Sequence, residues 1–523
     1  MFAIKTKAQK VALAGSFNNW DTKADVLEKD EDGIWRIQKD LPPGEYFYKF
    51  VINDSLWLAD PSNPQKSKDS WNNSVLTINE NGRIIMEDKK VNKNDPGYYY
   101  LNEKARKSPT WLRQAVIYEV FARAYSKKGF NGITEKIAYL KKLGIDILWL
   151  MPINPAGQKN RKGQLGSPYA IRDYYGINPE FGNANDFKEL VETAHQNEIR
   201  VILDWVADHS AWDNPWIEQH PEWYTHDENG QIIPPNPDWT DTADLNYENK
   251  ELRQEMIRAM SYWITEFDVD GFRCDVAALV PLDFWVEARS KLQKIKPELI
   301  MLSESEEKLH HLASFDLTYE KKIRNSLHKI AFENGNKHDF AEAYNLQKYN
   351  FPKNSLRMHW LENHDQVRAL EYFGENYIYP ASVVQFTIEG VPLLFMGQEF
   401  GDRNWKKWES LFDPIQLNWE NFDNKLFAHY KALVKLRKEH AALTSSDFKI
   451  LDCGHEKTVA YLKKSQKEQI LVVTNFSDEE SKIDLNCDEL KSGTIFFDLI
   501  NEEEYGQRKI TLLPFGYKIL ELR

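Results

Sequence analysis

The chain has 523 residues, of which 42% are hydrophobic and 28% charged, and its formal net charge is −13. A chain of this length exceeds one ordinary domain, so we expect two to four domains at roughly 150 residues each. The acidic balance, with no basic stripe to offset it, argues against a nucleic-acid partner. The sequence has no run of about 18 apolar residues, so a membrane span is not expected either.

Three cysteines occur, Cys274, Cys453 and Cys487, and they have the spacing of neither a disulfide framework nor a zinc site. The first five residues lack the basic and apolar segments of a secretory signal. We therefore expect a cytoplasmic protein. A periplasmic or secreted location is the alternative if the chain is a trimmed mature form, and the sequence indicates no particular oligomeric state.

Residues 1–85 contain short alternating runs, such as 10–14 and 46–51, separated by clusters of Asn, Asp, Gly and Pro. This pattern is typical of short strands joined by turns, and it predicts a β-sandwich. Residues 86–110 are rich in Lys, Asn, Asp and Pro. This composition predicts a linker.

From residue 111 to 443, short apolar runs alternate with helical patterns, for example the apolar stripe between Ile133 and Leu143. Eight strands with intervening helices predict a central (β/α)₈, or TIM, barrel, whose active site lies at the C-terminal ends of its strands. The expected strands are 116–121, 147–151, 201–206, 271–274, 299–303, a strand near 314–317, 357–361 and 391–396.

The connection after the third strand, residues 209–246, is long and rich in Pro, Asp, Asn and Trp. A long excursion at this end of a barrel usually shapes the substrate cleft. Alternating runs return at residues 444–523 and predict a second β-sandwich. The expected fold class is thus multidomain α/β, with a central barrel between two β-sandwich domains.

Asp275, Glu304 and Asp365 each follow a short apolar run, where a charge cannot serve the core. Hydrolysis of a glycosidic bond needs one carboxylic acid and one facing carboxylate, which two strand ends can supply. Arg273 lies two residues before Asp275, so both side chains point to one face of the strand. A guanidinium there would keep the carboxylate ionised.

Each residue also has a plainer interpretation. Arg273 and Asp275 could form a simple ion pair, and residues 363–365 (NHD) could cap a turn. Glu306 and Glu307 compete with Glu304 for the role of the acid, although only Glu304 directly ends the apolar run.

Together these segments resemble glycoside hydrolase family 13, the α-amylase family. The family motifs stand here as DWVADH at 204–209, GFRCD at 271–275, the segment around Glu304, and NHD at 363–365. The resemblance implies a retaining mechanism with Asp275 as nucleophile, Glu304 as acid and then base, and Asp365 as stabiliser of the transition state. It covers the chain from Trp111 onward.

The same resemblance implies substrate-binding roles for Tyr169, which would stack on a sugar, and for His209 and His364, which would hydrogen-bond its hydroxyls. Asp204 would position Arg273. No cofactor is required for this chemistry. A structural calcium at Asp208 and Asp244 is possible, but a local hydrogen bond or ion pair of Asp208 is an equal alternative, and no metal is predicted.

Ala278 and Leu279 stand where many relatives carry Lys-His to bind the leaving-group sugar. The expected function is therefore hydrolysis of α-1,4-glucosidic bonds in starch, glycogen or maltooligosaccharides. The alternatives are a cyclodextrin- or pullulan-type hydrolase or a 4-α-glucanotransferase with the same three carboxylates, and, more remotely, a non-catalytic glucan-binding protein. The expected partner in each case is an α-glucan.

Residues 8–78 resemble carbohydrate-binding module family 48, the glycogen-binding type, through GSFNNW at 15–20, GEYFYKF at 44–50 and WLADP at 57–61. In sugar-binding members two tryptophans clamp the glucan while Lys and Asn hydrogen-bond its hydroxyls. The resemblance implies glucan binding here, and the alternative is a module that only packs. The matching positions are Trp20, Lys49, Trp57 and Asn72.

Overall fold

The computed structural model describes residues 2–6, 8–30, 33–60, 63, 65–67, 71, 73–78, 84–85, 103–485, 490 and 494–523. The chain forms two compact units. The first unit comprises Met1–Lys104 and Gly335–Lys353, and the second comprises Ala105–Asn334 and Asn354–Arg523. In the described part of the chain, no helix is long and apolar enough to cross a membrane.

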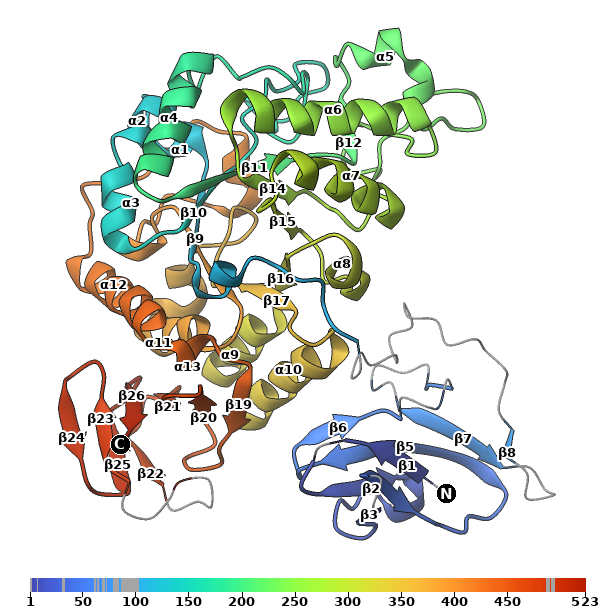
Figure 1. The fold of residues 1–523 in the computed structure, drawn as a ribbon, viewed down its shortest axis with the longest axis vertical. Coiled ribbons are helices and arrows are strands. Elements are labelled where there is room, and N and C mark those ends of the chain that lie inside the picture. Colours follow the sequence, from blue (N-terminus) through green and yellow to red (C-terminus); the bar gives the residue numbers. More distant parts are fainter. Residues whose placement is uncertain are drawn as a thin grey trace. The chain divides into compact units, whose positions relative to one another are not determined.

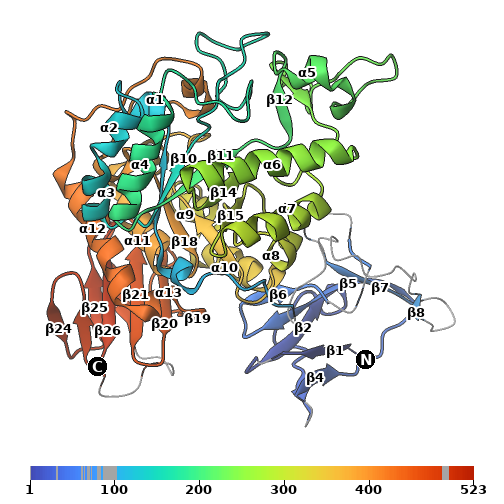
Figure 2. The same cartoon turned by 45° about the horizontal axis from the view of Figure 1, so that its top comes forward.

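The second unit contains a closed barrel of parallel strands (Figures 1 and 2). Each barrel strand pairs with the next barrel strand along the chain, and β18 pairs with β9 to close the ring. The expected eight-stranded barrel is confirmed. Its strands are β9 (Ile117–Val120), β10 (Ile147–Leu150), β11 (Arg200–Trp205), β14 (Gly271–Cys274), β15 (Ile300–Ser303), β16 (Leu317–Glu320), β17 (Leu356–His359) and β18 (Val391–Phe395).

The barrel interior is a packed apolar core, as the short apolar strands predict. Seven of the eight strands contribute buried side chains to it, among them Ile117, Trp149, Ile202, Leu302, Leu317, Met358 and Leu393. The remaining strand, β14, places Arg273 in register with Asp204 of β11 and Leu302 of β15. A charged residue at this level of the barrel needs partners, and they define the site described below.

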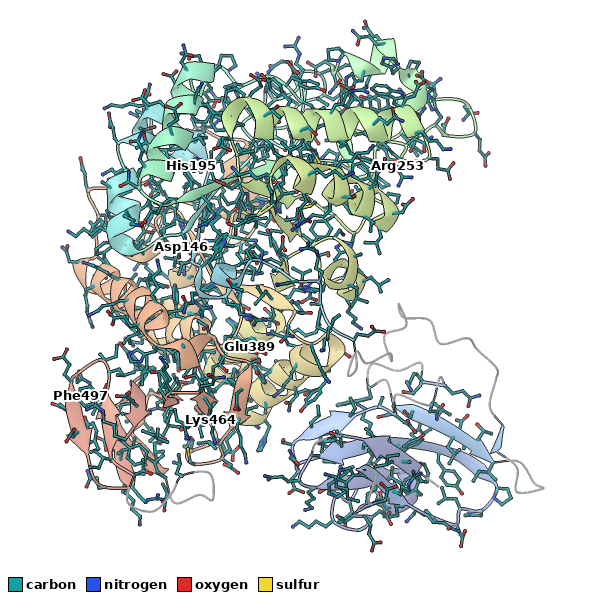
Figure 3. The ribbon with its side chains drawn as sticks, in the orientation of Figure 1. Asp146, His195, Arg253, Glu389, Lys464 and Phe497 are labelled. Carbon is teal, nitrogen blue, oxygen red and sulfur yellow. The ribbon has the colours of Figure 1, made fainter. Side chains whose placement is uncertain are left out.

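Helices follow the strands, and their apolar faces are buried. They are α1 (Ala122–Tyr125), α2 (Phe130–Thr134), α3 (Ile137–Leu143), α4 (Ala184–Gln196), α6 (Lys250–Phe267), α7 (Leu282–Ile295), α8 (Lys308–Ala313), α9 (Lys322–Phe332), α11 (Ala369–Thr387), α12 (Asn424–Glu439) and α13 (Ala441–Thr444). Asp146, labelled in Figure 3, ties α12 to the barrel because it accepts from Lys438 Nζ at 2.8 Å and from the Val116 N–H at 2.9 Å.

Two local expectations differ from the structure. The stripe from Ile133 to Leu143 is buried, but it belongs to two short helices, α2 and α3, instead of one. The strand expected near 314–317 starts only at Leu317. Asp316 accounts for the later start, because its carboxylate accepts from Arg289 Nη1 at 2.6 Å and from the Met301 N–H at 2.9 Å.

The excursion between β11 and β14 has its own small structure. Its strands β12 (His209–Ala211) and β13 (Thr242–Asp244) pair antiparallel, and α5 (Trp216–Gln219) lies between them in sequence. The expected excursion after the third strand is thus present. It starts at His209, directly after the DWVADH segment, and so holds this histidine at the C-terminal end of the barrel.

The C-terminal part of the second unit consists of two antiparallel sheets that share one apolar core. The larger sheet has the strand order β19, β20, β21, β26, β23, β24, and the smaller pairs β22 with β25. The strands are β19 (Asp447–Ile450), β20 (Thr458–Lys464), β21 (Gln469–Asn475), β22 (Ser481–Asp484), β23 (Phe496–Asp498), β24 (Glu503–Tyr505), β25 (Lys509–Leu512) and β26 (Tyr517–Leu522). β21 contacts both α11 and α13.

The first unit contains two antiparallel sheets around a common core of Phe2, Val11, Trp35, Phe50 and neighbouring side chains, as expected for a sandwich. The strands are β1 (Phe2–Lys5), β2 (Val11–Gly15), β3 (Glu28–Lys29), β4 (Ile34–Ile37), β5 (Gly44–Ile52), β6 (Leu56–Leu58), β7 (Ser74–Ile78) and β8 (Ile84–Ile85). Most of the expected linker, residues 86–102, lies outside the described residues.

One helix of the first unit comes from far along the chain. α10 (Lys337–Asn350) lies in sequence between α9 and β17 of the barrel, within the range 111–443 that was expected to form the catalytic domain. It contacts β6, and Tyr349 near its end packs against the core of the sheets. By these contacts the segment belongs with the N-terminal sheets.

Candidate active site

The C-terminal ends of the barrel strands surround a cavity of about 480 Å³. Asp275 follows β14, Glu304 follows β15, and Asp365 lies on the segment after β17. All three carboxylates line the cavity, together with Tyr169, His209 and His364. The structure therefore brings six of the eight predicted barrel-site residues to one cavity, and the other two, Asp204 and Arg273, lie directly behind it.

Arg273 is fully buried and forms ion pairs with three carboxylates. Its Nη1 lies 2.8 Å from Asp204 Oδ1 and 2.7 Å from Asp275 Oδ1, and its Nη2 lies 2.9 Å from Glu304 Oε1. One planar cation thus fixes the separation and orientation of the two carboxyl groups that face the cavity. Such a shared partner is more than the simple Arg273–Asp275 ion pair of the plainer interpretation.

Glu304 is held in a setting suited to a general acid. The Val276 N–H donates to Glu304 Oε2 at 2.9 Å, and Val276 itself has a φ of +35°, which is unusual for a β-branched residue. Burial outweighs the opposing effect of Arg273 and raises the pKa of Glu304 to about 7. The carboxyl group therefore keeps its proton up to nearly neutral pH.

The pKa of Asp275 differs from what its pairing with Arg273 alone would predict. Arg273 and His209 do lower the pKa of Asp275, as a neighbouring cation should, but burial is the larger influence and the pKa is raised above its ordinary value. The ionised form is thus held at a cost in folding free energy. Such a loss of folding free energy is common where a fold holds a reactive group in its functional form.

Glu306 and Glu307, the competitors of Glu304, do not line the cavity. The Glu306 carboxylate lies 3.5 Å from Arg357 Nη2 and 3.6 Å from Lys322 Nζ, and Glu307 is the exposed residue that precedes α8. The geometry therefore leaves Glu304 as the candidate acid.

His364 belongs to a chain of hydrogen bonds that leads through Tyr169 to Asp204. Burial disfavours its charged form, but Asp365 and Glu119 outweigh burial and raise the pKa of His364 to about 9. The imidazolium then donates through Nδ1 to Glu119 and through Nε2 to the Tyr169 hydroxyl at 2.8 Å. Tyr169 in turn donates to Asp204 Oδ2 at 3.0 Å, and its ring stacks on His364 with a centroid distance of 5.4 Å.

The excursion lines another part of the cavity. His209 is buried, its Nδ1 lies 3.2 Å from Asp208 Oδ2, and its ring lies 5.5 Å from that of Trp239. Burial opposes the charged form of His209, but Asp208 and Asp275 raise its pKa nevertheless. A protonated imidazole at this position can donate a hydrogen bond to a sugar hydroxyl.

The residues considered for calcium do not form a carboxylate cage. Asp208 Oδ2 lies 3.2 Å from His209 Nδ1, and Asp244 is the backbone register partner of His209 in the β12–β13 ladder. Among the described residues, no three His, Cys, Asp or Glu side chains converge where they could hold a metal ion.

Sequence reasoning missed several residues around the cavity. Glu119 is fully buried in β9 and holds His364, and Trp149 Nε1 donates to Asp204 Oδ2 at 3.2 Å. A glutamate inside the apolar run 117–120 was the available signal for the first. Trp239 lines the cavity from a loop and the half-exposed Trp408 from the short 3-10 helix Lys407–Leu411, and neither segment has a periodic pattern that would mark these residues.

Leu279 is 57% exposed, and Ala278 is exposed as well. Neither lines the cavity. The expected contact of these two positions with a leaving-group sugar therefore stays a prediction.

In the first unit, three of the four residues expected to bind glucan lie together. Trp20 and Trp57 have ring centroids 6.1 Å apart, and both line a second cavity together with Lys49. The fourth, Asn72, lies outside the described residues.

Comparisons with known proteins agree with this geometry. The model of the alpha-amylase catalytic domain matches residues 121–241 and 222–422, which is more than half of the chain. The chain belongs to the α-amylase family. It is therefore a glycoside hydrolase of that family, and its three carboxylates lie within the matched range.

The flanking domains of this α-amylase family member also match known models. Residues 1–83 match the glycogen recognition site of AMP-activated protein kinase, and residues 448–519 match the C-terminal domain of maltogenic amylase. The first match confirms the resemblance to a glycogen-binding module. The second identifies a domain for which the sequence had offered no family signature.

Individual relatives include several activities. Alpha-amylase 3 of Dictyoglomus thermophilum is 27% identical over 486 residues, covering 79% of this chain and 94% of the relative. A cyclomaltodextrinase of Geobacillus thermopakistaniensis is 26% identical, covering 78% and 77%. The crystal structure of the maltogenic alpha-amylase AmyB from Thermotoga neapolitana superimposes with a TM-score of 0.72 at 33% identity, covering 79% of this chain and 99% of AmyB.

Proposed function

We propose that the protein hydrolyses α-1,4-glucosidic bonds in starch, glycogen or maltooligosaccharides through a covalent glycosyl-enzyme intermediate. The observation that carries the proposal is the pairing of Arg273 with both Asp275 and Glu304 at one end of the barrel. It supports a nucleophile and an acid held by one cation. The names of the relatives support α-glucans as the substrate class.

In the proposed mechanism, Glu304 donates its proton to the glycosidic oxygen while the Asp275 carboxylate attacks the anomeric carbon. The bond to the leaving sugar breaks, and a covalent ester to Asp275 forms. Glu304, now ionised, takes a proton from water, which attacks the same carbon and releases Asp275. Asp365 and the imidazolium of His364 line the same cavity and would hold sugar hydroxyls during both steps.

The proposed roles predict the pH profile of kcat/KM. Glu304 works in its protonated form, so activity should fall as the pH rises through about 7, where this carboxyl loses its proton. Asp275 works in its ionised form, so activity should also fall at acidic pH, at a pH above the ordinary pKa of an aspartate.

The measurement is kcat/KM from pH 4 to 10 with an unactivated maltooligosaccharide and with an aryl maltoside whose phenol is a good leaving group. The aryl substrate needs no proton from Glu304, so its alkaline limb should move to higher pH. An unchanged alkaline limb with both substrates would contradict the acid role of Glu304.

The choice between hydrolysis and transfer is tested by product analysis on maltoheptaose. A hydrolase is expected to release only oligosaccharides shorter than seven glucose units at every time point. Early products longer than maltoheptaose would show that a sugar acceptor intercepts the intermediate, and would favour a glucanotransferase. This experiment is informative because Ala278 and Leu279 stand at the positions that the family resemblance assigns to binding of the leaving-group sugar, and neither has a polar side chain.

We also propose that the N-terminal module binds glucan through Trp20, Trp57 and Lys49. The two rings are tilted by 46° and Trp57 is 37% exposed, so they offer an open aromatic surface to the face of a sugar.

A further inference from the structure

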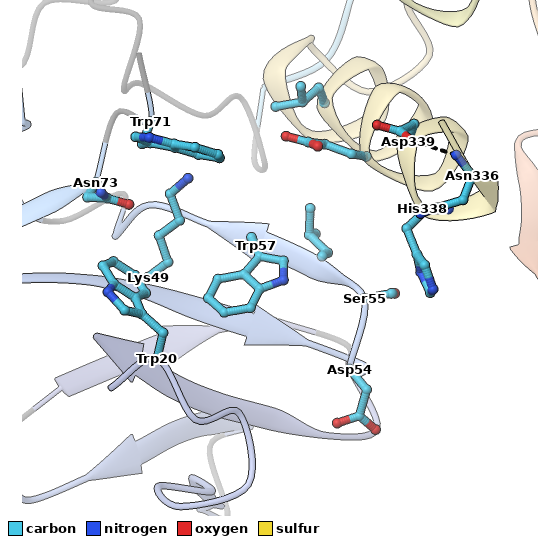
Figure 4. Close-up of a pocket in the computed structure, with 13 residues that line it drawn as sticks. Trp20, Lys49, Asp54, Ser55, Trp57, Trp71, Asn73, Asn336, His338 and Asp339 are labelled. Atoms are coloured by element: carbon cyan, nitrogen blue, oxygen red, sulfur yellow. Dashed lines mark hydrogen bonds between the residues drawn. The ribbon is translucent and has the colours of Figure 1, made fainter. Parts of the chain in front are cut away.

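The first unit contains a cavity of about 630 Å³ that the module does not form alone (Figure 4). One side consists of Trp20, Lys49 and Trp57 on the sheet. The other side consists of residues of α10, among them His338 and Glu342. The volume lies within the range of about 300–1,000 Å³ that is typical of small-molecule sites.

The sheet side of the cavity is aromatic. Trp20 and Trp57 lie side by side, and Lys49 extends between them and Trp71 (Figure 4). Trp71 is 71% exposed and also lines the cavity. Three indole rings and one ammonium group offer apolar faces with a polar group between them, which suits the apolar face and hydroxyl edge of a sugar.

The α10 side of the cavity is polar. His338, Glu342 and Leu346 are spaced by four residues, so they lie on one face of the helix, and all three line the cavity. His338 and Glu342 are exposed. Both can exchange hydrogen bonds with hydroxyl groups.

The start of α10 is defined by a local cap, and its contacts with β6 and with the core of the sheets set its position. Asn336 caps the helix, because its side chain accepts from the His338 N–H at 2.9 Å while its own N–H donates to Asp339 Oδ2 at 2.8 Å. At the other end, Tyr349 packs against the core of the sheets. The polar face is therefore held beside the tryptophans as part of the same unit.

We propose that α10 forms the second wall of the glucan site, so that a linear α-glucan segment lies in a cleft between the tryptophans and the helix. The rings stack on the sugar faces, Lys49 donates to hydroxyls on the sheet side, and Glu342 and His338 bind hydroxyls on the other edge of the chain. The inference rests on the proposed glucan binding by the module. It adds that residues encoded inside the barrel sequence complete the site.

The test measures binding of maltoheptaose by the full chain carrying Asp275→Asn, which keeps the ligand intact. The part of the maltoheptaose binding that is lost in Trp57→Ala is assigned to the cleft. Glu342→Ala is expected to weaken this component roughly tenfold, since it removes a charged hydrogen-bond acceptor, and Glu342→Gln by less, since the amide still accepts. His338→Ala is expected to weaken it roughly threefold. Alanine and glutamine are good helix formers, so α10 should remain folded.

The matched control is Glu45→Gln, which removes an exposed carboxylate of the same sheet outside the cavity and should leave binding unchanged. Wild-type affinity in Glu342→Ala and His338→Ala, with loss of binding in Trp57→Ala, would contradict the proposal that α10 forms the second wall of the site. Unchanged binding in Trp57→Ala would overturn it as well, together with the glucan site of the module. Hydrolysis of an aryl maltoside by proteins that retain Asp275 tests the catalytic proposal separately.

Discussion

Replacing Asp275 with asparagine is expected to lower kcat by about 10⁴-fold or more, because the amide cannot form the covalent ester. Stability should not fall with it. Burial raises the pKa of Asp275, so its ionised form costs folding free energy at neutral pH, and a neutral isostere removes that cost. Asparagine also retains an oxygen that can accept from Arg273 Nη1. The melting temperature of Asp275→Asn should therefore equal or exceed that of the wild type.

The measurements are kcat on maltoheptaose and thermal unfolding of the same preparations. Asp447→Asn, at an exposed position of β19, is the matched control and should change neither quantity. Substantial residual hydrolysis by Asp275→Asn, with contamination excluded, would contradict the nucleophile assignment. A large fall in melting temperature would contradict the argument from burial.

Replacing Arg273 with methionine is expected to produce the second large effect. Removal of one partner from a buried ionic group costs about 3–5 kcal/mol, and here three carboxylates would be left without their shared cation. Because Arg273 lowers the pKa of Asp275, its loss should raise that pKa further and leave less ionised nucleophile at neutral pH. We expect kcat/KM to fall by roughly 10³-fold.

If Arg273 had only a structural role, its replacement would lower the stability without shifting the pH profile of kcat/KM. Arg289→Met is therefore the matched control, since Arg289 is buried and pairs with Asp316 at 2.6 Å outside the cavity. It should destabilise the protein while leaving the pH profile in place. For Arg273→Met, the acidic limb of kcat/KM should move to higher pH. An unmoved acidic limb in Arg273→Met would contradict its electrostatic role.

The barrel and its carboxylates could be predicted because their signals are local. Short apolar runs predicted all eight strands. Asp275 and Glu304 directly follow two of these runs, and they were predicted to meet in one site because parallel strands end on the same side of a barrel. The start of β16 was misplaced because Asp316 binds side chains from other segments. The sequence pattern of residues 314–317 gives no signal of these long-range contacts.

Other features depend on long-range contacts and could not be inferred. Glu119 meets His364 across 245 positions of sequence, and α10 joins sheets that precede it by more than 250 residues. The sign of the pKa shift of Asp275 also required the structure. Sequence spacing identified the favourable cation, Arg273, but only the degree of burial shows that desolvation is the larger effect.

The mechanism is tested most directly by identifying the residue that carries the covalent intermediate. Protein carrying Glu304→Gln lacks the base that assists hydrolysis, so it should accumulate an ester when it reacts with a slow-turnover maltosyl fluoride, whose leaving group needs no proton. Mass spectrometry of the digested protein is expected to place one maltosyl group on the peptide that contains Asp275. Absence of an adduct under conditions where fluoride is released, or an adduct on Asp365, would contradict the proposed roles.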